Sequence, residues 1–125
     1  MIVSVGVDAV EIARIGALLE RSEERFERRV FTAAESDYCR GRQRPAESYA
    51  ARFAAKEAAL KCLGTGWSEG AGFRDVEVSR MPSGDTELHV TGAAAERARE
   101  LGITRWHVSL TYTETTATAF VVAER

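Results

Sequence analysis

The sequence has few of the residues that build metal clusters or redox centres. It contains 2 cysteines and 2 histidines. Cys39 and Cys62 have neither metal-site nor redox spacing, and His89 and His107 have no cysteine or histidine nearby that would complete a zinc site. No serine lies in a recognisable nucleophile elbow, so a Ser-His-Asp hydrolase is not indicated. The chemistry of any active site must come from other residue types.

Long apolar runs and an excess of one charge are also lacking. The longest apolar segments are far too short to span a membrane, and MIVSVGVDAVEI lacks the basic region and cleavage site of a signal peptide. The 17 basic and 19 acidic residues give a formal net charge of −2, so there is no overall nucleic-acid footprint. We therefore expect a cytoplasmic protein with no membrane and no nucleic-acid partner, in which only a local patch could attract a charged partner.

Length and patterning predict one α+β domain over residues 1–125. Hydrophobic residues make up 45% of the chain and charged residues 29%, which fits a globular fold. The patterns predict, in chain order, a strand over 2–7, helices over 9–21, 22–29, 32–40 and 48–63, strands over 73–79 and 86–91, a helix over 92–101, and strands over 105–112 and 116–123. This order predicts a mainly antiparallel sheet with helices packed on one face.

The segment RFAAKEAALKCLGTG, residues 52–66, lacks the broad polar face of a surface helix. Alanines occupy one side and an apolar stripe the other, so we expect this helix to be covered on both sides. Buried charges need partners. Glu57 and Lys61 are one helical turn apart and could pair with each other, but such a pair leaves Arg52 and Lys56 unexplained.

Two carboxylates from separate elements could hold a divalent cation. Asp8 follows the predicted strand 2–7, and Glu57 lies on the alanine-rich helix. Mg²⁺ suits a site with few carboxylates, several waters and substrate phosphates. Asp8 could equally cap the helix that follows it, and both interpretations remain open from the residues alone.

Lysines followed by glycines indicate a site for phosphate. Lys56 and Lys61 precede Gly64, Thr65 and Gly66. Lysine supplies positive charge, and a glycine loop lets backbone N–H groups approach an anion. The order differs from a Walker A motif, in which the lysine comes after the glycines. A plain helix C-cap would account for Gly64 but not for the second glycine.

Four arginines, Arg14, Arg21, Arg25 and Arg28, follow helical spacing and share one face if helices 9–21 and 22–29 are nearly continuous. We call this set the arginine face. The neighbouring glutamates lie off it, and such segregation of sign on a nearly neutral chain predicts an acidic protein partner. The alternative is a solvated helix with i,i+4 ion pairs.

The motifs GVDAVEIARI, FTAAE, RFAAKEAALKCLGTG, WHVSL and AFVVAE together closely resemble the holo-acyl-carrier-protein synthases, the small stand-alone class of 4′-phosphopantetheinyl transferases. The resemblance covers essentially the whole chain in the same order and spacing. It implies a Mg²⁺-dependent enzyme that transfers phosphopantetheine from coenzyme A to a serine of an acyl carrier protein and releases adenosine 3′,5′-bisphosphate. It further implies a homotrimer with active sites at subunit interfaces.

The resemblance also implies roles for individual residues. Asp8 and Glu57 match the metal-binding carboxylates, and Lys61 matches a lysine that contacts a coenzyme A phosphate. Coenzyme A is implied to bind at Arg52, Lys56 and the loop of Gly64, Thr65 and Gly66. Arg14 and Arg21 match basic positions that face the acidic carrier protein, and Arg25 and Arg28 extend the arginine face. The general base stays open between Glu57, a metal-bound water, and Glu35 acting through water.

The chain departs from the family at two places. In SLTYT, Tyr112 stands where many relatives carry a histidine. Its hydroxyl could replace the histidine at the pyrophosphate, or transfer could be slower. The turn Gly84-Asp85-Thr86 stands where Gly-Lys-Pro is common and concerns a hairpin rather than the chemistry.

Other functions are a catalytically weak module that binds coenzyme A or carrier protein, and an unrelated sugar- or nucleotide-phosphate enzyme. The presence of both metal carboxylates favours the transferase over the module. Whether the carrier serves fatty-acid or polyketide synthesis stays open.

Overall fold

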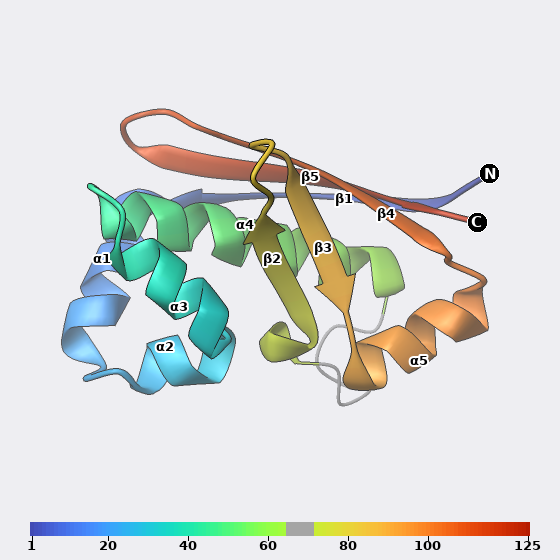
Figure 1. Ribbon diagram of the computed structural model, residues 1–125, viewed down its shortest axis with the longest axis horizontal. Helices are drawn as coiled ribbons and strands as arrows, with labels where there is room; N and C mark the ends of the chain where they lie inside the picture. The colour runs from blue at the N-terminus through green and yellow to red at the C-terminus, as the bar shows by residue number, and fades with distance from the viewer. Residues whose placement is uncertain (65–71) are drawn as a thin grey trace.

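The computed structural model describes residues 1–64 and 72–125, so Thr65 and Gly66 of the predicted phosphate loop lie outside the described residues. The elements, in chain order, are β1 (Ile2–Glu11), α1 (Ile12–Arg21), α2 (Arg25–Val30), α3 (Ala33–Arg40), α4 (Pro45–Leu63), the short 3₁₀ helix η1 (Phe73–Asp75), β2 (Val76–Arg80), β3 (Thr86–Val90), α5 (Gly92–Leu101), β4 (Arg105–Tyr112) and β5 (Thr116–Glu124). Figure 1 shows their arrangement. None of the described helices is long and apolar enough to cross a membrane.

A three-stranded antiparallel sheet forms one layer of the molecule. Its strand order is β1-β5-β4, while β2 and β3 form a separate antiparallel hairpin. All five helices lie on one face of the three-stranded sheet, and no described element covers the opposite face (Figure 1). The α+β class and the one-sided packing are therefore confirmed, and the strands divide into two sheets rather than one.

Helix α4 forms the centre of the core between the sheet and the other helices (Figure 1). Its alanines Ala50, Ala51, Ala54, Ala55, Ala58 and Ala59 are all buried, as expected for a helix covered on both sides. The closest approach is at Gly6 in β1, where a Cβ atom would lie 2.1 Å from the Ala58 carbonyl oxygen. Because only glycine fits there, strand β1 lies directly against the turn of α4 that carries Glu57.

Strand β1 is longer than the sequence pattern predicted. It pairs with β5 as far as Glu11, which lies opposite Thr116, so Asp8 lies inside the strand and not beyond its end. The cap of α1 is Glu11, which makes no side-chain capping bond. The expectation that the strand ends before Asp8, and the alternative that Asp8 caps the next helix, are both wrong. Pairing with β5 keeps this segment extended.

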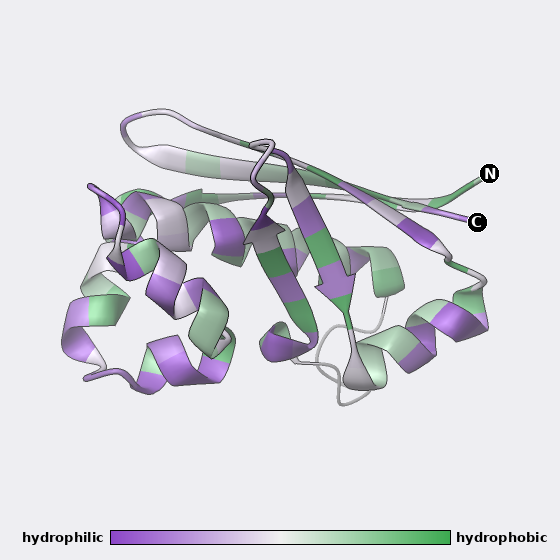
Figure 2. Ribbon diagram, in the orientation of Figure 1, coloured by the Kyte–Doolittle hydropathy of each residue, from purple (hydrophilic) through white to green (hydrophobic). Residues whose placement is uncertain are grey.

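Helices α1 and α2 do not form one continuous helix. Between them Glu23 and Glu24 have positive φ angles of 49° and 73°, which lie in the left-handed region. The chain turns there, and the two helices meet at an angle in Figure 1. The expectation of a nearly continuous arginine face is therefore wrong: Arg14 and Arg21 lie on α1, and Arg25 and Arg28 on α2. Figure 2 shows that α2 is mainly hydrophilic.

The helix boundaries at α3 and α4 follow the local chemistry of the sequence. Thr32 and Glu35 form the predicted capping box of α3. Helix α4 begins at Pro45, a favoured first-turn residue, and ends at Leu63, after which Gly64 has a left-handed φ of 74°. Gly64 is thus a helix C-cap.

Candidate active site

The lysine and the aspartate predicted at the site meet between α4 and β1. Lys61 Nζ donates hydrogen bonds to Asp8 Oδ1 at 3.1 Å and to the Val7 carbonyl oxygen at 3.0 Å. The Lys61 side chain remains 53% exposed, so its ammonium also reaches solvent. Lys61 therefore pairs with Asp8 rather than with Glu57, the partner that the helical spacing alone suggested.

Glu57 completes this cluster of charges. It is half-buried, and burial raises the pKa of its carboxyl, with the negative charge of Asp8 adding to the rise while Lys61 and Arg14 oppose it. Two carboxylates that repel each other attract a cation, and carboxylate oxygens are the ligands that Mg²⁺ prefers. Among the described residues no group of three or more His, Cys, Asp and Glu side chains could hold a metal. Asp8 and Glu57 supply two carboxylates that could hold a Mg²⁺ completed by water and substrate oxygens.

Lys56 does not belong to this cluster. Its side chain is 0% exposed and forms an ion pair of 2.7 Å with Glu35. The expectation that Lys56 binds coenzyme A is therefore wrong, because no ligand at the surface can reach it. In the sequence, the burial of Lys56 was indicated by its position within the apolar stripe of the helix.

Glu35 is excluded as a general base for the same reason. It is only 1% exposed, and its oxygens accept hydrogen bonds from the backbone N–H groups of Thr32 and Val78. A carboxylate enclosed in this way has no access to a water at the surface site. Of the bases left open by the sequence, Glu57 and a metal-bound water remain.

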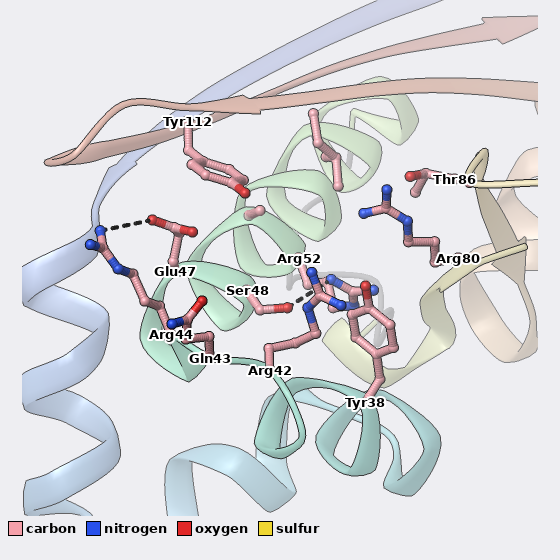
Figure 3. Close-up of a pocket in the computed structure, with 13 residues that line it drawn as sticks. Tyr38, Arg42, Gln43, Arg44, Glu47, Ser48, Arg52, Arg80, Thr86 and Tyr112 are labelled. Carbon is pink, nitrogen blue, oxygen red and sulfur yellow. Dashed lines mark hydrogen bonds and ion pairs between the residues drawn. The ribbon is translucent and has the colours of Figure 1, made fainter.

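A pocket of about 580 Å³ opens between α3, α4 and the strand ends (Figure 3). We call it the arginine pocket, because its lining includes Arg42, Arg44, Arg52 and Arg80 together with Tyr38, Ser48 and Tyr112. Sequence reasoning found Arg52 and Tyr112 but missed the other three arginines. Two of these lie in the GRQRP loop before α4, where closely spaced basic residues precede a helix N-terminus, an arrangement suited to anions.

Arg52 is the innermost arginine of the pocket. It is 5% exposed, its Nη1 donates to Ser48 Oγ at 3.2 Å, and its guanidinium carbon lies 4.2 Å from the centre of the Tyr38 ring. Its Nε is buried with no hydrogen-bond partner. Because its guanidinium lines the pocket, the positive charge of Arg52 suits an anionic ligand such as a phosphate.

Tyr112 lies at the end of β4 and points into the arginine pocket (Figure 3). Its 55% exposure sets it apart from the half-buried residues that precede it on the same face of the strand. Tyr112 is therefore not a core residue, and its hydroxyl is available to a ligand.

The carboxylate cluster and the arginine pocket lie on different sides of α4. Ser48 faces the pocket, and Glu57 follows nine residues later on the same helix. At about 100° per residue this places the two side chains on opposite sides of the helix axis. The carboxylate cluster and the arginine pocket thus face different directions.

The four residues of the arginine face, Arg14 and Arg21 on α1 and Arg25 and Arg28 on α2, are all exposed. The charge of Arg14 lowers the pKa of Glu57, which shows that the arginine is near the carboxylate cluster. Arg25 and Arg28 line a pocket together with Phe26, and Arg28 pairs with Glu24 at 2.7 Å. The arginine face is therefore a bent surface whose α1 end adjoins the carboxylates.

Comparison with known proteins identifies the family. Residues 4–120 match the family model of the 4′-phosphopantetheinyl transferase superfamily. The chain belongs to this superfamily. It is 50% identical to a holo-[acyl-carrier-protein] synthase of Methylobacterium radiotolerans over 99% of this chain and 94% of the relative. The resemblance seen in the motifs is confirmed, and the alternative of an unrelated sugar- or nucleotide-phosphate enzyme is ruled out.

Solved structures of phosphopantetheinyl transferases share the fold. The crystal structure of the holo-[acyl-carrier-protein] synthase of Neisseria meningitidis matches with a TM-score of 0.90 and 34% identity, covering 100% of both chains. The Helicobacter pylori synthase, solved in complex with coenzyme A, matches with a TM-score of 0.84 and 28% identity, covering 96% of this chain and 99% of that one. As a phosphopantetheinyl transferase, the chain is an enzyme.

Proposed function

We propose that the protein transfers the 4′-phosphopantetheine group of coenzyme A to a serine of an apo acyl carrier protein, with Mg²⁺, and releases adenosine 3′,5′-bisphosphate. The observation that carries this proposal is the convergence of Asp8, Glu57 and Lys61 at the contact between β1 and α4. The Helicobacter pylori relative was solved with coenzyme A bound, which supports coenzyme A as the donor. The proposed reaction belongs to fatty-acid or polyketide biosynthesis in the cytoplasm.

The carboxylate cluster would carry the chemical step. Asp8 and Glu57 would hold Mg²⁺, which when bound neutralises charge on the pyrophosphate oxygens. The ammonium of Lys61 is exposed, so Lys61 would give up its ion pair with Asp8 and donate a hydrogen bond to a phosphate oxygen. The serine oxygen forms a bond to the β-phosphorus, while the bond from that phosphorus to the bridging oxygen breaks. Glu57 or a metal-bound water would take the serine proton.

The arginine pocket would bind the phosphates of the donor. Arg52 lines the pocket with its guanidinium charge, and the other arginines of the pocket add positive charge around it. The Tyr112 hydroxyl would contribute one hydrogen bond, which is worth about 0.5–1.5 kcal/mol. The pocket would thereby account for the predicted contacts of Arg52 and Tyr112 with coenzyme A, while Gly64, Thr65 and Gly66 remain proposed contacts.

We take the carboxylate cluster and the arginine pocket as two halves of one site that is completed between neighbouring chains of the homotrimer that the family resemblance implies. One coenzyme A would be held between the arginine pocket of one chain and the carboxylate cluster of the next. Such a head-to-tail contact closes into a ring when the rotation between neighbours allows it. The uncovered face of the three-stranded sheet supports an assembly, because Val5, Val7 and Phe120 are exposed there.

The arginine face would receive the acidic carrier protein. Arg14 and Arg21 are exposed on α1, and Arg14 lies near Glu57, where the carrier serine must arrive. Complementary charge steers such an encounter and fixes its orientation.

The experiment that tests the proposal is incubation of the protein with an apo acyl carrier protein, coenzyme A and Mg²⁺, followed by mass spectrometry of the carrier. We expect the carrier to gain one phosphopantetheine group. Binding of coenzyme A and carrier without any gain in mass would instead support the catalytically weak binding module.

A further inference from the structure

Lys56 is a buried charge that the proposed reaction does not use. Besides its bond to Glu35, its Nζ donates to the carbonyl oxygens of Phe73 at 3.0 Å and Val76 at 2.5 Å. An ammonium has three donors, so all of them are satisfied. Lys56 therefore joins α4 to η1 and to the start of β2.

Glu35 is held as firmly as its partner. It closes the capping box of α3 through Thr32, and its Oε2 accepts the backbone N–H of Val78 in β2 at 2.7 Å. Thr32 Oγ1 in turn donates to Glu77 Oε2 at 2.6 Å. The Lys56–Glu35 pair thus connects α3, α4, η1 and β2 in one closed network.

The energetic reason for such a pair is not simple stabilisation. Burial lowers the pKa of Lys56, with the negative charge of Glu35 opposing that shift, which reflects the cost of bringing an ammonium into the core. Apolar residues of similar volume often stabilise a fold as well as a buried ion pair does. What an ion pair adds is direction, because its hydrogen bonds are satisfied at only one position of the helix.

That position is the helical turn that carries Glu57. Lys56 directly precedes Glu57, and its bonds hold this turn from the side of η1 and β2. Ala58 directly follows Glu57, and its carbonyl packs against Gly6 of β1 on the other side. The turn is therefore fixed from two sides, in rotation and along the helix axis.

We propose that Lys56 and Glu35 are a positioning pair that holds Glu57 beside Asp8 in the geometry needed to bind a divalent cation. The inference rests on the proposed function, because it takes Asp8 and Glu57 as the cation ligands. Loss of the pair should weaken cation binding although both carboxylates remain.

The test is Mn²⁺ binding, measured from the electron paramagnetic resonance signal of free Mn²⁺, to the full chain and to the double variant Lys56→Met/Glu35→Gln. This variant removes both charges together and so avoids leaving one of them unpaired in the core. We expect it to unfold cooperatively but to bind Mn²⁺ about tenfold more weakly, the usual effect of losing a residue that orients a metal ligand. At Mn²⁺ concentrations below saturation the kcat should fall with it.

A matched control separates positioning from stability. Ile103→Ala removes a buried side chain between α5 and β4, so it should lower the melting temperature without changing the Mn²⁺ affinity of the folded protein. If the double variant does not fold, Glu35→Gln replaces it, with an expected loss of about tenfold in Mn²⁺ affinity.

The outcomes are distinguishable. A folded pair variant with wild-type Mn²⁺ affinity and wild-type kcat would overturn the positioning role, and unchanged affinity in Glu35→Gln would do the same. Wild-type protein whose Mn²⁺ binding is absent, or is unaffected by Asp8→Asn, would instead refute the metal site of the proposed function, and the inference would fall with it.

Discussion

Replacing Lys61 with methionine should tighten the binding of a divalent cation at Asp8 when coenzyme A is absent. In the structure the Lys61 ammonium lies 3.1 Å from Asp8 Oδ1, where it competes with a metal ion for the same oxygen. Two unit charges at this distance interact by about 1.3 kcal/mol in a water-like dielectric. Because Lys61 is half-exposed, we discount this value to about 0.5–1 kcal/mol, which corresponds to a roughly two- to fivefold gain in affinity.

The assay is a titration with Mn²⁺ in which the free ion is measured by electron paramagnetic resonance. Arg14→Gln is the control, because Arg14 also places a positive charge near Glu57 but acts there through its charge alone; its effect should be smaller. Lys61→Met should at the same time lower kcat, since Lys61 is proposed to donate to a phosphate oxygen. Mn²⁺ affinity that is unchanged or weaker in Lys61→Met would refute the competition.

Three further predictions concern the carrier, the donor and acid stability. The double variant Arg14→Glu/Arg21→Glu should raise the KM for carrier protein much more than the KM for coenzyme A. The wild-type KM for carrier protein should also rise with salt, because exposed charges are screened beyond about 8–10 Å. A KM for carrier protein that does not depend on salt would contradict this. Tyr112→Phe should reduce kcat/KM for coenzyme A by less than about tenfold. Tyr112→His should retain activity, and its activity should increase at lower pH, where imidazole is charged. A loss of about three orders of magnitude in Tyr112→Phe would instead show that the hydroxyl is catalytic. Burial would raise the pKa of Glu27, but hydrogen bonds and charges, led by the bond from Arg40, outweigh it and lower that pKa. Ionised Glu27 thus stabilises the fold above its unfolded-state pKa, and this contribution is lost as pH falls through the lower folded-state pKa. In a series of urea-unfolding measurements at different pH, Glu27→Gln should make the free energy of unfolding fall less steeply on the acid side. The same steepness as in wild type would contradict a stabilising role of ionised Glu27.

Much of the fold could be predicted because the deciding interactions are local. The capping box at Thr32 and the left-handed glycine at the end of α4 are set by neighbouring residues. The alanine content of α4 indicated burial on both sides, which the packing against β1 explains. Strands β4 and β5 alternate in the usual way and lie within one residue of their predicted bounds.

The errors arose where a distant segment decides the structure. Asp8 lies within a strand because β5 pairs with that segment, and no local pattern shows this. The break before α2 uses two glutamates in the left-handed region, where the sequence offers no glycine as a signal.

The site could be predicted only in part, for the same reason. Asp8, Glu57 and Lys61 were found because the motifs carry them. The burial of Lys56 depends on Glu35, which is far away in sequence. Arg80 reaches the arginine pocket from the β2–β3 hairpin, so its role follows only from the folded chain.

The measurement that tests the central claim most directly is the transfer rate of Asp8→Asn and Glu57→Gln, read as the gain in mass of apo acyl carrier protein with coenzyme A and Mg²⁺. Each change removes the negative charge of one proposed cation ligand while keeping the size of the side chain. Glu20→Gln, on the exposed surface of α1, is the control for the loss of one negative charge. The account predicts that the two site variants transfer slower by at least about a hundredfold while the control matches wild type. Transfer at the wild-type rate by either site variant would contradict it.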